Sequence, residues 1–438
     1  MPEIFSTLIP FFGVLLVLVT IHELGHFITA KIAGVRVLEF GFGYPPKLFG
    51  RRFGETEYTV NLLPLGGFVK LAGEEDPNVE RSFASKPVLT RLIILAAGPG
   101  MNALLPIVLI TSSLLFPRQV LVETVRVGAV APGSPAAEAG LQTDDIIKAA
   151  NGSALMNRSD LNYQTELSLG SKMDLSIERA GQTRVVPVYP RWTSPNGEGP
   201  TGISLDALVR VAAVQANSPA EAAGIQPGDV VVSVNGKTIR FLQEVSASIR
   251  PGEQASIVLE RNGARVPISV TPRVNPPAGE GPLGVQLGAS SPDQKISTVT
   301  TPFFDALGEG TRRSFDMITL FKNGIISSFT AQSGPALTGP IGIAQATGEI
   351  AKAGPAPLLE WAALLSMNLA ILNILPIPML DGGRVFFVLL EWVRRGKRIS
   401  PEREGLVHLV GFVILMGLIL LISFNDVARL LKGESIFP

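Results

Sequence analysis

The chain has 438 residues, of which 46% are hydrophobic and 17% charged, and this is too apolar for an ordinary soluble protein of its size. Its 37 basic and 37 acidic residues balance, so charge gives no reason to expect nucleic acid as a partner. The absence of cysteine excludes disulfides and thiolate ligands, so any metal must be held by imidazole and carboxylate groups.

Four apolar runs are long enough to cross a membrane. About 20 helical residues span a hydrocarbon core of roughly 30 Å. A cleaved signal peptide is the alternative for the first run, but Met1-Pro2-Glu3 lacks a basic region and no small-residue cleavage pattern follows. We therefore predict four transmembrane helices, at about 4–33, 88–116, 358–392 with a proline-rich interruption, and 406–431.

Basic residues predict the orientation of these helices. Nine lysines and arginines lie between Lys31 and Arg91, and five lie between Arg394 and Arg403. An excess of basic residues marks short cytoplasmic loops. We therefore expect both termini and the long central region to face the other side of the membrane.

The central region contains an internal repeat. Ser134-Pro-Ala and Asn151-Gly152 recur as Ser218-Pro-Ala and Asn235-Gly236, at a constant offset of 218 − 134 = 84 residues. Each copy is long enough to bury its own core, and β-rich runs ending in Asn-Gly turns indicate small, mostly β domains. The pattern resembles tandem PDZ domains of the circularly permuted bacterial type, at 121–206 and 207–290.

PDZ domains bind extended peptides by adding a strand to a sheet. From the sequence, peptide binding and a role as a bulky cover remain equally open. The following segment, 291–355, places aromatic residues such as Phe303, Phe304 and Phe315 among basic ones. It predicts an amphipathic helix on the outer membrane surface, and packing against the second repeat is the alternative.

A His-Glu-Leu-Gly-His sequence in the first apolar run is the strongest chemical signal. Positions i and i+4 share one face of a helix, so His22 and His26 can bind one zinc ion while Glu23 acts as general base. His22 lies about 17 residues past Phe5, roughly 25 Å along the helix. Ionisable groups at that depth are costly and normally persist for function, although a buried polar trio is the alternative.

Two histidines and a water leave zinc one ligand short. Asp381 is the candidate, because it lies in Asn373-Ile-Leu-Pro-Ile-Pro-Met-Leu-Asp381-Gly-Gly within the third apolar run. Prolines there break the helix and can turn the carboxylate toward the first run. A helix-end cap is the alternative role of Asp381.

The order of these motifs resembles the site-2 protease family of intramembrane zinc metalloproteases, closest to the bacterial RseP type, across the whole chain. The resemblance implies that His22, His26 and Asp381 bind Zn²⁺, that Glu23 is the catalytic base, and that Asn373 and Pro376 help to hold substrate. Gly98-Pro-Gly-Met-Asn102 matches a Gly-Pro-x-x-Asn element of the family, for which close helix packing is a sufficient role.

The resemblance also sets the expected architecture and partners. It implies a polytopic α-helical protein of the bacterial inner membrane, surrounded by membrane lipids. Residues 38–72 would form a cytoplasmic-side reentrant β-hairpin, and the two PDZ-like domains would lie in the periplasm. The implied substrates are single-pass membrane proteins already cut once, of the anti-sigma-factor type in a sigma-E stress response, and remnant signal peptides, with the PDZ pair excluding bulky substrates.

Two other classes of protein compete with a protease. A non-catalytic scaffold with a structural metal has no reason to keep Glu23, and a transporter with a broken third helix would be expected to show inverted repeats. His408 in the fourth run matches no motif, and we interpret it as a packed or interfacial histidine.

Overall fold

The computed structural model describes residues 2–74, 76–195, 197–277, 280–330 and 338–431. The chain divides into two units. The helical unit contains Met1–Arg118, Thr300–Lys322 and Ala336–Pro438, and the sheet unit contains Gln119–Val299 and Asn323–Pro335.

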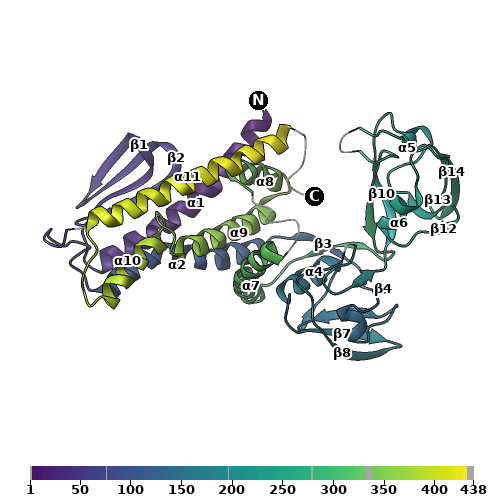
Figure 1. The fold of residues 1–438 in the computed structure, drawn as a ribbon, viewed down its shortest axis with the longest axis horizontal. Coiled ribbons are helices and arrows are strands. Elements are labelled where there is room, and N and C mark those ends of the chain that lie inside the picture. Colours follow the sequence, from purple (N-terminus) through teal and green to yellow (C-terminus); the bar gives the residue numbers. More distant parts are fainter. Residues whose placement is uncertain (1, 75, 196, 278–279, 331–337, 432–438) are drawn as a thin grey trace. The chain divides into compact units, whose positions relative to one another are not determined.

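Among the described residues of the helical unit, four helices are long and apolar enough to cross a membrane, which confirms the number predicted from sequence. They are α1 (Pro2–Ile32), α2 (Val88–Leu115), α9 (Pro355–Ile374) and α11 (Pro401–Leu431), all labelled in Figure 1. The helix α2 packs against both α1 and α9. Gly25 allows α1 to approach closely, because a Cβ at this residue would lie 2.4 Å from the Ala97 carbonyl oxygen of α2.

The third apolar run forms two helices separated by a short connection. The helix α9 ends at Ile374, and α10 (Asp381–Val393) begins after six intervening residues. Pro376 and Pro378 lie in the connection, where they prevent a continuous helix. The candidate span is accordingly Pro355–Ile374, shorter than the predicted 358–392, and Asp381 is the first residue of the next helix.

Between α1 and α2 the chain forms a long β-hairpin of β1 (Val37–Phe53) and β2 (Thr56–Leu71). Several register shifts interrupt its antiparallel ladder. The hairpin exposes many large apolar side chains, namely Tyr44, Leu48, Phe49, Phe53, Val60, Leu62 and Leu63. Such exposure is unusual for a hairpin in water and is typical of a surface that meets lipid or a partner.

Two further helices, α7 (Phe303–Thr330) and α8 (Pro340–Lys352), lie in the region 291–355, where the sequence predicted one amphipathic helix. In the helical unit, α7 packs Ala306 and Gly310 against α2. The exposed large apolar side chains of α7 are Phe303, Phe304, Leu307, Phe315, Ile318, Ile325 and Phe329. The helix α8 packs against α1, α9 and α11.

The sheet unit contains the two repeats as separate cores. In the first, β6-β5-β7-β8 form one sheet and β4 pairs with β9. Its elements are β4 (Val127–Val130), α3 (Pro135–Glu138), β5 (Ile146–Ala150), β6 (Ser153–Ala154), α4 (Arg158–Leu167), β7 (Met173–Arg179), β8 (Gln182–Val188) and β9 (Ile203–Leu205). A further pair joins β3 (Arg118–Val122) to β16 (Lys295–Val299).

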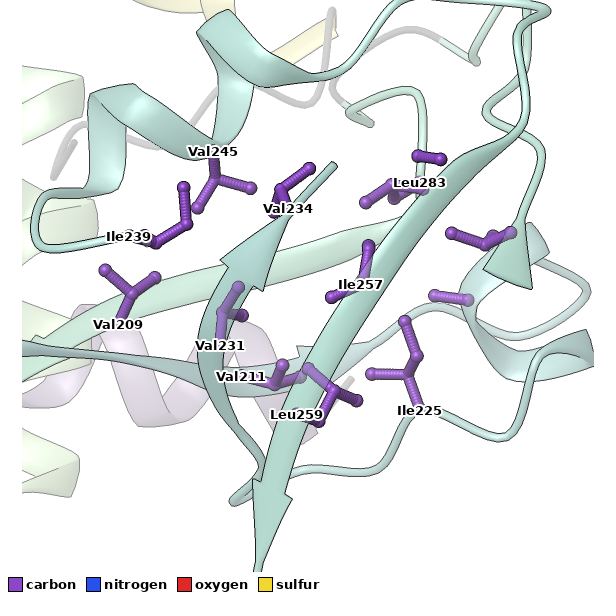
Figure 2. Close-up of a cluster of buried hydrophobic side chains, with 13 residues drawn as sticks. Val209, Val211, Ile225, Val231, Val234, Ile239, Val245, Ile257, Leu259 and Leu283 are labelled. Carbon is purple, nitrogen blue, oxygen red and sulfur yellow. The ribbon is translucent and has the colours of Figure 1, made fainter. Parts of the chain in front are cut away.

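The second repeat forms a sheet in the order β14-β13-β11-β10-β15, with β12 paired to β11. Its core of valine, isoleucine and leucine side chains is shown in Figure 2. Its elements are β10 (Leu208–Val214), α5 (Pro219–Ala222), β11 (Val230–Val234), β12 (Lys237–Thr238), α6 (Leu242–Ser248), β13 (Ala255–Arg261), β14 (Ala264–Val270) and β15 (Val285–Ser290).

The repeated residues have the same structural role in both copies. Ser134 and Ser218 cap short helices by accepting the backbone N–H groups of Ala137 and Glu221. Both Asn-Gly pairs occupy turns with positive φ at each residue, as a tight hairpin turn requires. The sequence repeat is therefore a structural repeat.

Candidate metal centre

Three predicted site residues from two distant parts of the chain converge at one point. His22 and His26 lie one turn apart on α1, and their Nε2 atoms are 3.2 Å apart. Asp381, at the start of α10, places its Oδ2 3.0 Å from Nε2 of His22 and 3.4 Å from Nε2 of His26. Both histidines are buried.

The separation of these atoms matches a tetrahedral zinc site. Ligands that each lie 2.0–2.1 Å from one zinc ion at tetrahedral angles are about 3.3 Å from one another. Among the described residues, His22, His26 and Asp381 form the one group of histidine and carboxylate side chains close enough to share an ion. Three protein ligands leave a fourth position open, as in catalytic zinc sites.

The second nitrogen of His26 is oriented by α2. Its Nδ1 lies 2.8 Å from the Ile94 carbonyl oxygen. A carbonyl only accepts hydrogen bonds, so Nδ1 carries the proton and the Nε2 lone pair is left for a metal. Metal-binding histidines commonly make this contact to a backbone carbonyl.

Asn102, also on α2, has the corresponding position beside His22. Its carboxamide nitrogen lies 3.3 Å from His22 Nδ1, and its buried Oδ1 has no partner within the described chain. A half-turn of the carboxamide would set Oδ1 against His22, where it accepts the Nδ1–H. The Nε2 lone pair of His22 is then also left for a metal, so the residues present fit zinc.

Gly98 lets the two helices approach at the site. A Cβ added to Gly98 would lie 2.2 Å from His26 Nε2 and 2.8 Å from His22 Nε2. The Gly98-Pro-Gly-Met-Asn102 element was expected to serve helix packing, and in the structure it also contacts both histidines. Sequence reasoning identified the element and missed this contact.

Glu23 faces a cavity of about 760 Å³ that also reaches His26 and Asp381. The hairpin forms another wall, since Tyr44 and Gly67 line the same space. A Cβ at Gly67 would lie 3.0 Å from Glu23 Cγ, so the β2 backbone passes directly beside Glu23. Charged residues also line the cavity, including Lys70, Glu74, Arg384, Arg398 and Glu404.

The two predicted substrate-holding residues lie near the site but outside this cavity. Asn373 is buried in the last turn of α9, and Pro376 is in the connection to α10. Neither belongs to the cavity lining of the described chain. His408, for which the sequence indicated only packing, does line the cavity and accepts a hydrogen bond from the Met379 amide.

Comparison with protein families matches residues 10–418 to the family described as Peptidase family M50. The chain is 32% identical to the zinc metalloprotease RasP of Oceanobacillus iheyensis, over 97% of this chain and 99% of that protein. It is 31% identical to the regulator of sigma-E protease RseP of Salmonella typhimurium, over 94% and 96%. It is 29% identical to the regulator of sigma-W protease RasP of Bacillus subtilis, over 97% and 99%.

Proposed function

The chain belongs to peptidase family M50 and is a zinc metalloprotease of the site-2 type, and from this premise we propose how its own residues cleave a peptide bond. His22, His26 and Asp381 hold the zinc ion. Glu23 is the general base. The observation that carries this proposal is the convergence of the two Nε2 atoms and the Asp381 carboxylate at 3.0–3.4 Å.

When bound, zinc supplies a Lewis acid that polarises the scissile carbonyl and makes a water molecule acidic near neutral pH. Glu23 takes the proton of the attacking water and passes it to the leaving amide nitrogen. Glu23 follows His22 directly in the chain and lines the same cavity as Asp381, so its carboxylate is placed to carry out this proton transfer. The cavity also gives water a route to a site surrounded by apolar helices.

The substrate must be held extended, because a helical peptide bond is shielded by its own hydrogen bonds. We assign this role to the hairpin β1–β2, which acts as a membrane-reentrant edge to which the unwound substrate adds as a strand. The passage of Gly67 beside Glu23 supports this assignment, and so do the exposed apolar side chains of the hairpin. Asn373 and Pro376 hold the substrate from the α9 side.

The sheet repeats act as PDZ domains that filter substrates in the periplasm. The active site lies toward the cytoplasmic leaflet, in keeping with the basic residues that flank the hairpin. The substrates are single-pass membrane proteins that a first protease has already shortened, of the anti-sigma-factor type. Two relatives are named as the regulator of sigma-E protease RseP and the regulator of sigma-W protease RasP, and these names support this class.

Glu23→Gln tests the catalytic proposal. We expect cleavage of a single-pass substrate that lacks its outer domain to fall by at least about 10²-fold, because glutamine cannot accept the proton. The variant should retain one zinc ion per chain. Equal cleavage by both proteins would contradict the role of Glu23 and would favour a metal-containing scaffold.

Deletion of residues 121–290 tests the filter. If the repeats exclude bulky substrates, the shortened protein should cleave an intact substrate that the full chain leaves uncut. Cleavage of the already shortened substrate by the same protein is the control for folding. Unchanged selectivity would count against a filter.

A further inference from the structure

The connection between α9 and α10 determines where the Asp381 carboxylate lies. It is held in part by its own backbone: Ile377 N–H donates to Leu375 at 2.6 Å, and Leu380 N–H donates to Ile377 at 3.2 Å. Met379, two residues before Asp381, has a backbone φ of +78°, which residues other than glycine rarely adopt. Something outside the connection must hold Met379 there.

His408 of α11 supplies that contact. Its Nδ1 accepts a hydrogen bond from the Met379 backbone N–H at 2.8 Å. One turn further along α11, Gly411 lies against Pro378, and a Cβ at Gly411 would lie 2.3 Å from the Pro378 Cβ. The fourth apolar helix therefore contacts two consecutive residues of the connection that carries Asp381.

Packing fixes the orientation of the His408 ring. Its centroid is 5.5 Å from that of Phe387 on α10, and its side chain is 16% exposed. Because Nδ1 accepts from an amide, the ring proton belongs on Nε2, which lies 3.8 Å from the Glu404 carboxylate. The ring thus presents a single acceptor to the connection.

We propose that His408 is a positioning residue of the metal centre. By accepting the Met379 N–H, it keeps the connection in the one conformation that places Asp381 against His22 and His26. Without it, the Met379 N–H would lack its partner, and the connection would rotate to find another acceptor. This inference rests on the proposed role of Asp381 as a zinc ligand.

Three substitutions at His408 distinguish a positioning role from simple packing. In His408→Asn, the amide oxygen occupies the place of Nδ1 and can accept the same N–H. In His408→Gln, the oxygen lies one bond further out, and His408→Leu has no acceptor. All three are measured in the full-length, detergent-solubilised protein, by zinc competition with a chelator and by cleavage kinetics.

We expect His408→Leu and His408→Gln to bind zinc about 10–100-fold more weakly, the range seen when partners of metal ligands are removed. His408→Asn should restore the wild-type zinc affinity. At limiting zinc, kcat should fall with the affinity while KM is unchanged, because His408 acts on the metal centre and not on the substrate.

Wild-type zinc affinity in His408→Leu would overturn the proposal, and so would equal losses in His408→Asn and His408→Gln. Asp381→Asn, measured in parallel, distinguishes a failure of Asp381 as a zinc ligand from a failure of His408 as its positioning residue. If Asp381→Asn keeps wild-type zinc affinity, its role as a ligand has failed. If Asp381→Asn loses zinc and His408→Leu does not, only the positioning role has failed. Should His408→Leu fail to fold, the comparison of His408→Asn with His408→Gln decides.

Discussion

Gly98 of α2 lies against the imidazole of His26 so closely that a Cβ on Gly98 would stand 2.2 Å from Nε2. The His26 ring is not free to move away from such a Cβ, because its other nitrogen is hydrogen-bonded to the Ile94 carbonyl. The absence of a side chain at Gly98 is therefore a condition for the two histidines to face the same point.

Gly98→Ala should release the metal. The added methyl group would displace both Nε2 atoms, and we expect zinc affinity to fall by at least about tenfold, with cleavage falling in parallel. Gly100→Ala is a matched control, since it lies on the same helix and its Cβ would meet nothing within 4 Å. Equal zinc content in the two variants would show that the imidazoles can move aside at no cost.

Asn102 should matter as an acceptor. Asn102→Ala removes the group beside His22 Nδ1, and we expect a loss of zinc affinity of about 10-fold or more. Asn102→Asp keeps an acceptor and should bind zinc nearly as well as the wild type. Zinc competition on both variants checks this. A lower zinc affinity in Asn102→Asp than in Asn102→Ala would mean that Asn102 donates a hydrogen bond to His22.

The buried Arg91–Glu391 pair should stabilise the helical unit only as a pair. The Arg91 guanidinium donates to Glu391 at 2.8 Å, and both side chains are largely buried. Glu391 also accepts a hydrogen bond from Arg398 at 3.2 Å, so Glu391→Gln leaves the buried Arg91 without its carboxylate, whereas Arg91→Met leaves Glu391 one partner. Glu391→Gln should therefore cost about 3–5 kcal/mol of unfolding free energy, and Arg91→Met should cost less. The double variant Arg91→Met/Glu391→Leu should cost less than Glu391→Gln alone. Unfolding of the purified proteins in detergent measures all three, and additive losses would contradict coupling.

Acid should destabilise the second sheet repeat through Asp229. The hydrogen bonds from Arg261, at 2.7 Å to each carboxylate oxygen, hold the pKa of Asp229 below its ordinary value. The folded state then binds fewer protons than the unfolded state, so this stabilisation is present above the unfolded pKa near 3.9 and is lost as pH falls below it.

Unfolding of the repeat, followed by hydrogen exchange of β11 and β13 between pH 6 and 3, checks this. We expect Asp229→Asn to be less stable at pH 6 and to lose less stability on acidification. Glu253→Gln is the control, because the Arg250–Glu253 pair is exposed and should contribute little. If the unfolding free energy of the repeat depends on pH equally in the wild type and in Asp229→Asn, Asp229 is excluded as the titrating group.

Much of the fold could be predicted from local sequence. Hydropathy identified the four candidate spans, and the constant offset of 84 residues identified a repeat whose serine caps and Asn-Gly turns coincide in the structure. The end of α9 at Ile374 was less predictable. Prolines indicate that a helix breaks, but the length of the break depends on contacts from other helices, here His408 and Gly411 of α11.

The candidate site shows the same division. The i, i+4 spacing of His22 and His26 is local, so the sequence was enough to place them on one face of α1. The contacts of Gly98, Asn102 and His408 are between helices and depend on how far each helix is rotated and how deeply it is set. A single sequence does not encode these quantities in any short pattern, although buried polar residues in apolar runs do indicate where to look.

The two histidines and Asp381 lie at opposite ends of the chain, and this affects when the site can form. His26 precedes Asp381 by 381 − 26 = 355 residues. At a synthesis rate of about 5–20 residues per second, roughly 20–70 s separate the synthesis of the two histidines from that of Asp381. During this time a nascent chain has its first two apolar helices without the carboxylate that completes the group. The group that His22, His26 and Asp381 form therefore cannot be complete until nearly all of the chain has been made.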